Sequence, residues 1–377
     1  MRSIYLCIFS FFLAFSWAHA QITISSDYFP AIGDTLKTAT DNLPEGIDIG
    51  TPGGPQTWNF TTLQAPFTLN TTFLDATTGG AYSSFLDADL MVQLTAGSEA
   101  YYNLTTSKLE YLGYYGSDPL GLGLEIVARY SPPLIERRAP LNYQNSYEST
   151  GDLLLPFSAD DIPGGFLDSL PITPDSFRLR INTVRTEEMD AFGTIQIPGG
   201  SYEVLRMKRI DVSQNRLDAK LPFINWIDVT DLIQENPFFG EITTTSYHYF
   251  SNLSKEPIAV VTTDSDTEEP NRVEFKVVDN IINTNLSLSN QQPSLFAFPN
   301  PSYGDLRFDF QNLRPGNYAI KIYNILGMEV WKKEFWVAGN RSIKVNLGQL
   351  RKGTYLYSLV NAKGKTLATK RLLIVRP

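Results

Sequence analysis

Carboxylate side chains suited to acid–base chemistry gather in three short stretches of this 377-residue chain. Two carboxylates on either side of a glycosidic bond are the usual machinery of a glycoside hydrolase. The available groups are Asp87, Asp89, Asp160, Asp161, Asp264, Asp266, Glu268 and Glu269. None lies in a motif with catalytic spacing. We therefore interpret most of them as solvated turn residues and predict no catalytic residue among them.

Metal chemistry has few ligands to draw on. Residues 264–269 alternate oxygen-bearing side chains that could hold Ca²⁺, but the glycine and the terminal glutamate of an EF-hand loop are missing. We expect an acidic hairpin tip between strands at 258–262 and 272–277. The single cysteine, Cys7, lies in the N-terminal apolar run, and His248 is the only histidine beyond residue 20. We predict no metal and no cofactor, because zinc sites need His and Cys.

His248 would have to serve as the base of any Ser/His/Asp triad, since no other histidine follows residue 20. It lies between two tyrosines in a predicted strand, so a packed or hydrogen-bonded core histidine is the favoured interpretation. A group of tyrosines could stack on sugar rings, although cross-strand packing is the simpler expectation. The group comprises Tyr101, Tyr102, Tyr111, Tyr114 and Tyr115.

The N-terminus is predicted to be a secretory signal peptide, residues 1–20. Arg2 supplies the positive charge, an apolar run follows over residues 4–17, and an Ala-His-Ala pattern ends at Ala20. We expect cleavage before Gln21. No later segment reaches the roughly 18 apolar residues that a membrane span needs, so no transmembrane segment is expected after the signal is removed. Without cysteine, core packing must hold the exported chain together.

Residues 21–279 predict one large antiparallel β domain. Short apolar runs alternate with Gly and Pro, no fixed-period repeat is present, and residues 229–234 offer a single helical turn. Strands are expected at 71–74, 90–94, 100–104, 109–115 and 124–130. The class predicted for the whole chain is all-β.

A linker is predicted at residues 280–294, which carry no charge and are rich in Asn, Ser and Gln. The charge reverses across it. Residues 21–294 hold 16 Lys+Arg and 36 Asp+Glu (net −20), whereas residues 295–377 hold 14 and 4 (net +10). Such asymmetry predicts different partners for the two parts. The basic tail could dock on an acidic translocon or on anionic lipopolysaccharide, or it could simply be a soluble surface. Nucleic acid is not an expected partner.

The tail, residues 295–377, shows four period-2 runs at 305–310, 317–323, 342–347 and 354–360. Turn residues separate them, which is typical of a small immunoglobulin-like β-sandwich. Four short motifs also occur along the tail. The first two are Phe-Pro-Asn-Pro with a following Gly, and a Tyr-x-Ile-x-Ile-Tyr-Asn-x-x-Gly strand and turn. The last two are a Gly-x-Tyr element and a basic pair before the final aliphatic run. Their key positions are Pro299, Asn300, Pro301, Gly304, Tyr323, Gly327, Gly353, Tyr355, Lys370 and Arg371.

In this order, the four motifs resemble the type A C-terminal sorting domain carried by cargo of the type IX secretion system of Bacteroidetes-type bacteria. The resemblance implies that the tail engages the type IX translocon and its sorting machinery. It also implies passage through the periplasm to the outer cell surface or the medium. In the family, the domain is then commonly removed, and the cargo is attached to surface lipopolysaccharide or released.

Three stretches of the body resemble an uncharacterised module found in other cargo of this system. They are a Gly-x-x-x-x-Trp-Asn-Phe element that contains Trp58, a hairpin at 193–206, and an aromatic strand at 247–250. The resemblance carries no activity. Trp58 is expected to anchor a core and Pro-Gly-Gly at 198–200 to form the hairpin turn.

Thr35 and Ser169 each follow Asp and precede Leu. This pattern resembles the acceptor used for O-glycosylation in the same bacterial group. Both residues are therefore candidate modification sites.

We predict an exported cell-surface or secreted protein whose body is a binding or structural module, and we do not expect an enzyme. Two alternatives stay open. The first is an extracellular hydrolase that acts on glycans through carboxylates. The second is a carrier that holds a lipid or other apolar ligand inside a curved β-sheet.

Overall fold

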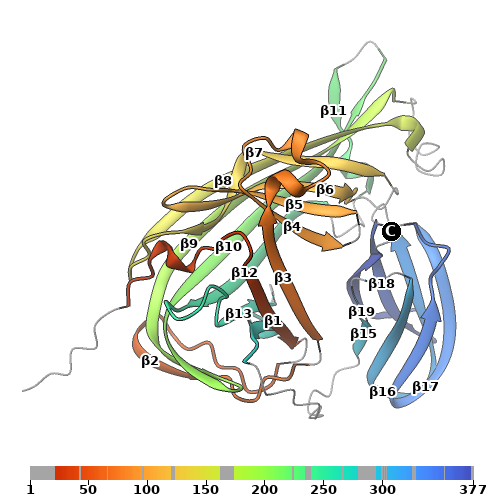
Figure 1. Cartoon of the computed structure of the whole chain (residues 1–377). Coiled ribbons are helices and arrows are strands. Elements are labelled where there is room, and N and C mark those ends of the chain that lie inside the picture. The colour runs from red at the N-terminus through yellow and green to blue at the C-terminus, as the bar shows by residue number, and fades with distance from the viewer. Residues whose placement is uncertain are drawn as a thin grey trace, which may run out of the picture.

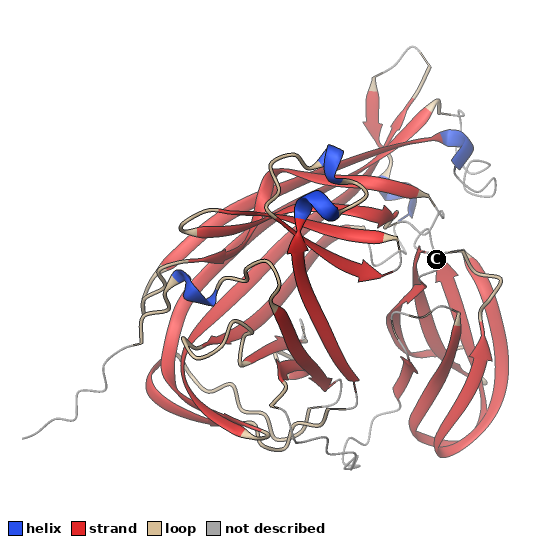
Figure 2. Ribbon diagram, viewed as in Figure 1, coloured by secondary structure: helices blue, strands red, loops and turns tan. Residues whose placement is uncertain are grey.

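The computed structural model confirms the all-β class (Figure 2). Among the residues that the structure describes, five 3₁₀ turns accompany the strands: η1 (Ser26–Tyr28), η2 (Ala76–Thr78), η3 (Tyr82–Ser84), η4 (Ala159–Asp161) and η5 (Thr230–Ile233). The turn η5 lies where the sequence predicts a helical turn. The structure describes residues 22–41, 44–65, 67–95, 97–119, 124–161, 174–222, 225–233, 239–264, 267–278, 294–298, 300, 302, 304–324, 328–351 and 353–374.

The body contains one large sheet of 14 strands. The strands are β1 (Thr35–Asp41), β2 (Gly53–Asn59), β3 (Phe67–Asp75), β4 (Leu90–Thr95), β5 (Ser98–Leu104), β6 (Lys108–Ser117), β7 (Glu125–Arg138), β8 (Ser146–Ser158), β9 (Ser176–Ile197), β10 (Gly200–Lys220), β11 (Trp226–Asp228), β12 (Gly240–Phe250), β13 (Ala259–Thr263) and β14 (Pro270–Lys276). The five strands expected near the N-terminal end of the body fall in β3 to β7.

Twelve of these strands close into an antiparallel barrel (Figure 1). From β3 to β10 each strand pairs with its successor, and the ring continues through β12, β13, β14 and β1 back to β3. The other two strands are additions, because β11 pairs with β10 and β2 runs parallel to β9. Closure satisfies the edges that an open sheet would leave unpaired. The sequence predicts the antiparallel domain but not its closure.

The β9–β10 hairpin is the longest pairing in the barrel, and it begins at the predicted Pro-Gly-Gly turn. Gly199 has φ +88°, a conformation that glycine adopts without steric cost. The register then shifts between Arg206 and Lys208. Because side chains alternate between the two faces of a strand, this bulge changes which residues point inward. The hairpin therefore contributes to two different cores on its two sides.

On the outer side, Trp58 of β2 anchors a core as the sequence predicts. Its side chain is buried, and its ring packs edge-to-face against Tyr249 with the ring centroids 5.1 Å apart. Its indole N–H donates to the Ile49 carbonyl at 2.8 Å. Arg206 is fully buried beside it and donates to both oxygens of Asp190 at 2.8 Å. The charge of this arginine is thus neutralised inside the core.

On the inner side, the side chains of β9 change from apolar to polar and back along the barrel. In order they are Phe177, Leu179, Ile181, Thr183, Arg185, Glu187 and Met189. The intervening Asn182, Thr186 and Glu188 are exposed, which places the alternating set inward. Two apolar clusters border the polar stretch. One contains Phe177 and Leu217, and the other contains Met189 and packs against the N-terminal segment at Tyr28 and Phe29.

The tail forms a separate small sheet with its own core. Its strands are β15 (Ser294–Phe298), β16 (Asp305–Asn324), β17 (Glu329–Asn346), β18 (Gly353–Asn361) and β19 (Thr366–Ile374). All ladders between them are antiparallel. The first half of β16 pairs with β15 and the second half with β18, and both halves bury side chains in one core, among them Phe308 and Ile320.

Within the described ranges, no helix has the length and apolar character needed to cross a membrane.

Candidate functional site

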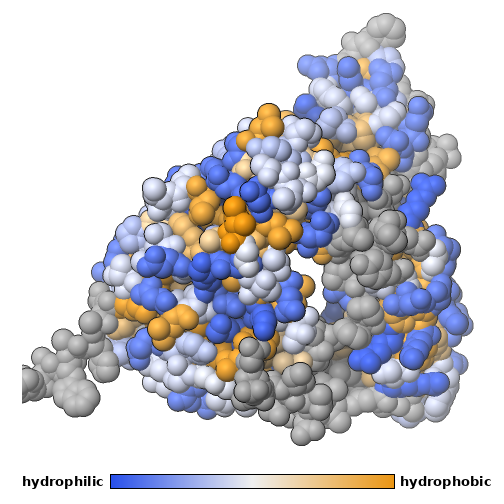
Figure 3. All heavy atoms as spheres, in the orientation of Figure 1, coloured by the Kyte–Doolittle hydropathy of each residue, from blue (hydrophilic) through white to orange (hydrophobic). Residues whose placement is uncertain are grey.

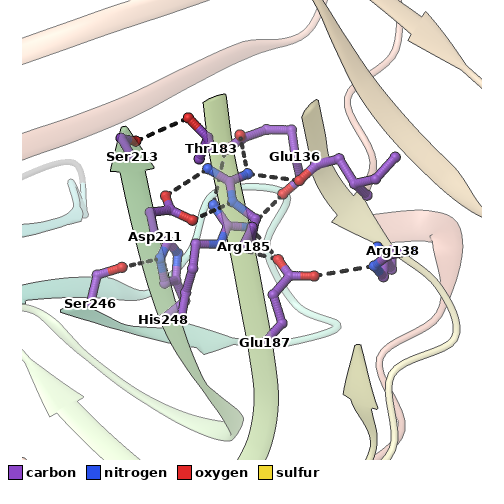
Figure 4. Close-up of polar contacts among 11 residues, drawn as sticks. Glu136, Arg138, Thr183, Arg185, Glu187, Asp211, Ser213, Ser246 and His248 are labelled. Carbon is purple, nitrogen blue, oxygen red and sulfur yellow. Dashed lines mark hydrogen bonds and ion pairs between the residues drawn. The ribbon is translucent and has the colours of Figure 1, made fainter. Parts of the chain in front are cut away.

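The barrel interior carries a layer of charged side chains between its two apolar clusters (Figure 4). On the visible outer face, by contrast, hydrophobic and hydrophilic residues are interspersed (Figure 3). We call the charged layer the lumen network and define it as Glu136, Arg137, Arg138, Arg185, Glu187, Arg209 and Asp211. Strands β7, β9 and β10 supply its members.

Paired ions form the centre of the lumen network. Arg185 on β9 donates from Nε and Nη2 to the two oxygens of Asp211 on β10, at 2.7 and 2.8 Å. Arg209 on β10 donates to Glu187 Oε1 at 3.1 and 2.8 Å, and Arg138 donates to the other oxygen of that carboxylate at 3.1 Å. The Arg185–Asp211 pair is a fork that binds both carboxylate oxygens, a geometry that combines strength with fixed orientation. The two pairs join β9, β10 and β7 rigidly.

Two of these arginines also complete the backbone of β7. Strand β7 is in register with β8 only where Tyr130 faces Leu153, and two prolines without N–H follow that point. Arg185 Nη1 donates to the Ile135 carbonyl at 2.7 Å, and Arg209 Nη2 donates to the carbonyl of the next residue at 2.8 Å. The two arginines thus supply N–H donors to β7 carbonyl groups where the β7–β8 ladder supplies none.

A glycine in β8 makes this close approach possible. A Cβ atom built on Gly151 would collide with the Leu134 side chain of β7. The side chain of β7 therefore occupies the space that a larger residue in β8 would take. A side chain at this position would force Leu134 to move.

Glu136 completes the network and remains ionised. It lies 3.3 Å from Arg185 and 3.5 Å from Arg209, and its side chain is 41% exposed. Burial would raise the pKa of this carboxyl group, but the attraction of Arg209, Arg185 and Arg137 lowers it below its usual value. A hydrolytic general acid needs a raised pKa. Glu136 is therefore poorly suited to donate a proton.

His248 on β12 is held neutral beside the network. Its Nε2 lies 2.9 Å from the hydroxyl of Ser246. Burial lowers its pKa well below 6.5, and the positive charges of Arg209, Arg185 and Arg137 lower it further. In the part of the chain that the structure describes, no carboxylate bonds to the ring. The Ser–His pair therefore lacks the acidic member of a catalytic triad.

Three tyrosines line another part of the inner face, and we call Tyr102, Tyr111 and Tyr130 the tyrosine wall. Their ring centroids follow one another at 5.3 and 5.6 Å. All three are half-buried, and burial raises the pKa of each hydroxyl group. None of the three hydroxyl groups has a hydrogen-bond partner among the described residues.

The tyrosine group named from the sequence is divided between the two faces of the sheet. Tyr101 stacks on Phe85 with centroids 4.4 Å apart and donates to Glu99 at 2.6 Å, in a cluster outside the barrel. Tyr115 packs against the same outer cluster. Only Tyr102, Tyr111 and Tyr114 belong to interior clusters.

The acidic stretches named from the sequence lie apart from the lumen network. Asp87 forms an exposed pair with Arg129, Asp89 accepts from the Leu104 amide, and Asp161 ends a short turn. Asp264 accepts from the Thr267 amide in the expected hairpin between β13 and β14. Asp160, Glu268 and Glu269 also lie in turns or loops, and Asp266 is outside the described residues. Searched over the described ranges, the structure holds no group of three or more metal-ligating side chains.

In the tail, the motif asparagine has a clear structural task. Asn300 Nδ2 donates to the Arg371 carbonyl, and its Oδ1 accepts from the Leu373 amide, both at 2.8 Å. The Ser302 amide donates to the Leu373 carbonyl at 2.8 Å. The Asn-containing segment thus lies beside β19 and imitates a further strand. Gly304 then turns the chain with φ +108°.

The remaining motif side chains also pack within the tail. Tyr355 is buried and donates to the Arg351 carbonyl at 2.8 Å, and Gly353 before it has φ +152°. Lys370 Nζ lies 3.3 Å from the ring centroid of Phe296, and burial lowers its pKa to about 8. Lys370 therefore joins β19 to β15.

Some of the other predicted positions are at least partly exposed, and the rest lie outside the residues that the structure describes. Tyr323 is half-buried near the end of β16, Arg371 is exposed, and Thr35 is exposed at the start of β1. The predicted cleavage site at Ala20 and Gln21, the acceptor Ser169, and the motif residues Pro299, Pro301 and Gly327 lie outside the described residues.

Residues 297–375 match the family model described as the secretion system C-terminal sorting domain. This domain marks the chain as a cargo protein of the type IX secretion system, exported across the outer membrane to the cell surface or medium. The match covers the tail alone, and no curated protein matches the chain. Among solved structures, the crystal structure of dimeric latent PorU from Porphyromonas gingivalis is similar, with 11% identity over 92% of this chain and a TM-score of 0.23. This chain spans 30% of that one.

The depressed pKa of His248 predicts a pH-dependent stability. Unfolding returns the imidazole to a pKa of about 6.5, so the unfolded chain binds a proton that the folded chain excludes. As the pH falls from 7.5 to 5, this group should lower the free energy of unfolding by up to about 1.4 kcal/mol per pH unit. His248→Gln should reduce that slope in urea unfolding curves. Equal slopes, or an imidazole NMR midpoint at or above 6.5, would contradict the assignment.

Proposed function

We propose that this chain is an exported cell-surface or secreted binding protein, in which the tail selects the export route and the barrel holds a small polar ligand inside. The proposed organisation is a signal peptide at 1–20, the body at 21–279, a linker at 280–294 and an immunoglobulin-like sorting domain at 295–377. It is supported by the position of the two sheets, since β14 ends at Lys276 and β15 begins at Ser294.

The observation that carries the binding role is a polar interior that solvent still reaches. Glu136 points into the lumen network, yet its side chain is 41% exposed. The tyrosine wall is half-buried and its hydroxyl groups are unpartnered within the described chain. Barrels of about eight strands fill their interior with side chains, and wider barrels such as this one leave more internal space. Enclosed polar groups without partners are costly, so water or a ligand must supply them.

The two alternatives fit this interior less well. A glycan hydrolase needs one protonated carboxyl group, whereas Glu136 is ionised and Asp211 and Glu187 are each ion-paired with an arginine. A carrier of a wholly apolar ligand would place hydrocarbon against four guanidinium groups. We therefore favour a ligand with polar groups of its own.

The partners proposed for the tail are the type IX translocon and its sorting machinery, with anionic lipopolysaccharide as a second partner. The net charge of +10 on residues 295–377 and the exposed Arg371 support the second of these.

Deletion of residues 295–377 should leave the protein in the periplasm, because the sorting domain is removed while the body keeps its own barrel. Cell fractionation and surface protease accessibility would measure this. The full-length chain in the same strain is the control. Surface display or secretion of the truncated chain would contradict the proposed role of the tail.

Native mass spectrometry of the protein purified from secreting cells tests the role of the body. We expect an added mass that disappears on denaturation. Tyr111→Phe removes a hydroxyl group from the tyrosine wall and should lower the loaded fraction, whereas Tyr115→Phe removes one from the outer cluster and should not. A protein that always carries its polypeptide mass alone would overturn the binding role.

A further inference from the structure

We propose that the ligand in the barrel is a ring-bearing carboxylic acid, with its carboxylate on Arg137 and its ring against the tyrosine wall. This inference rests on the proposed binding function and assigns the ligand class. Uronic acids and aromatic acids share the required chemistry.

The first observation is an imbalance of charge in the lumen network, which has four guanidinium groups and three carboxylates. Arg209 and Arg138 share Glu187, and Arg185 holds Asp211. The third carboxylate, Glu136, lies between Arg185 and Arg209. Within the lumen network one positive charge is left over, and it belongs to Arg137.

Arg137 is fixed in place without a carboxylate. Its Nη1 donates to the carbonyls of Tyr28 and Lys255, each at 2.7 Å, and its guanidinium carbon lies 5.3 Å from the centroid of the Tyr28 ring. No carboxylate of the described chain lies within ion-pair distance of it. A guanidinium group stays protonated in proteins, so this charge persists in the interior. Enclosed charges are normally paired, and an anion is the missing partner.

The edge that remains on Arg137 has the right shape for a carboxylate. Both backbone carbonyls bind Nη1, whereas Nε and Nη2 make no hydrogen bond to any residue that the structure describes. The Nε–Nη2 edge accepts the two oxygens of a carboxylate side by side. The same edge of Arg185 binds Asp211 in this geometry at 2.7 and 2.8 Å. The Nε–Nη2 edge of Arg185 thus shows how a carboxylate would bind to the same edge of Arg137.

The surroundings of Arg137 favour an acid with a ring. Arg137 lies directly opposite Leu109 in the β6–β7 ladder, and Leu109 packs in the same cluster as Tyr102 and Tyr111. From Tyr102 the tyrosine wall continues to Tyr111 and Tyr130. Tyrosine faces provide large apolar contacts, and their free hydroxyl groups can hydrogen-bond to ligand oxygens. His248 is neutral and adds no competing charge of either sign. A carboxylate attached to a hydroxylated or aromatic ring matches all of these groups.

Calorimetric titration of the full exported chain with paired probes tests this assignment. The pairs are galacturonate with galactose, and 4-hydroxybenzoate with 4-hydroxybenzyl alcohol. In at least one pair the acid should bind about tenfold or more tightly than its neutral partner, and the pair that responds identifies the ring type. Arg137→Gln should abolish this preference. The control Arg129→Gln changes an exposed outer arginine and should leave it intact.

A second variant keeps the test decisive if Arg137→Gln fails to fold. Tyr102→Phe retains the ring and the charge, so it should weaken the acid and the neutral partner by the same factor. Equal binding within both pairs, an unchanged preference in Arg137→Gln, or no binding of any probe would overturn the assignment. A neutral molecule found by native mass spectrometry would also overturn it, while the binding function itself would stand.

Discussion

Arg185 and Arg209, each held in place by an ion pair to Asp211 or Glu187, donate hydrogen bonds to β7 where the β7–β8 ladder is interrupted. Strand β7 is in register with β8 only at Tyr130, and the two arginines donate to backbone carbonyls of β7 further along the strand. The same side chains are charged and enclosed, so each must be paired to be tolerated. Closure of the barrel and a polar interior are therefore consequences of one arrangement.

That arrangement is the basis on which we propose binding rather than catalysis for the interior. Every carboxylate of the lumen network lies beside at least one arginine, and the single imidazole is neutral. Charged groups fixed in this way can attract and orient a ligand. The tail performs a separate task in export, and its motif residues act by shaping a small sheet. Asn300 and Lys370 both fasten strand β19.

Local patterns predict the fold class, the Pro-Gly-Gly hairpin and the Trp58 anchor. In the tail they predict separate strands at 305–310 and 317–323, whereas the structure has one continuous strand, β16. The interior site could not be predicted in the same way. From the turn at Gly199, simple counting pairs Arg185 with Val212, and only the bulge near Met207 brings Asp211 opposite it. A one-residue shift reverses which face is inward, and no sequence signal marks it. Charged residues lie on both faces of β9, as Arg185 and Glu188 show, so charge alone does not identify the residues that point inward.

The free energy of unfolding of Arg185→Met measures the central interaction most directly. The substitution removes the partner of Asp211 and the donor to the Ile135 carbonyl. We predict a loss of about 3 kcal/mol, the lower end for a buried pair because a quarter of the Asp211 side chain is exposed. Arg129→Met, which breaks an exposed pair, should cost about 0–1 kcal/mol. If the two variants lose the same stability in urea unfolding, the ion pairs do not hold the barrel closed.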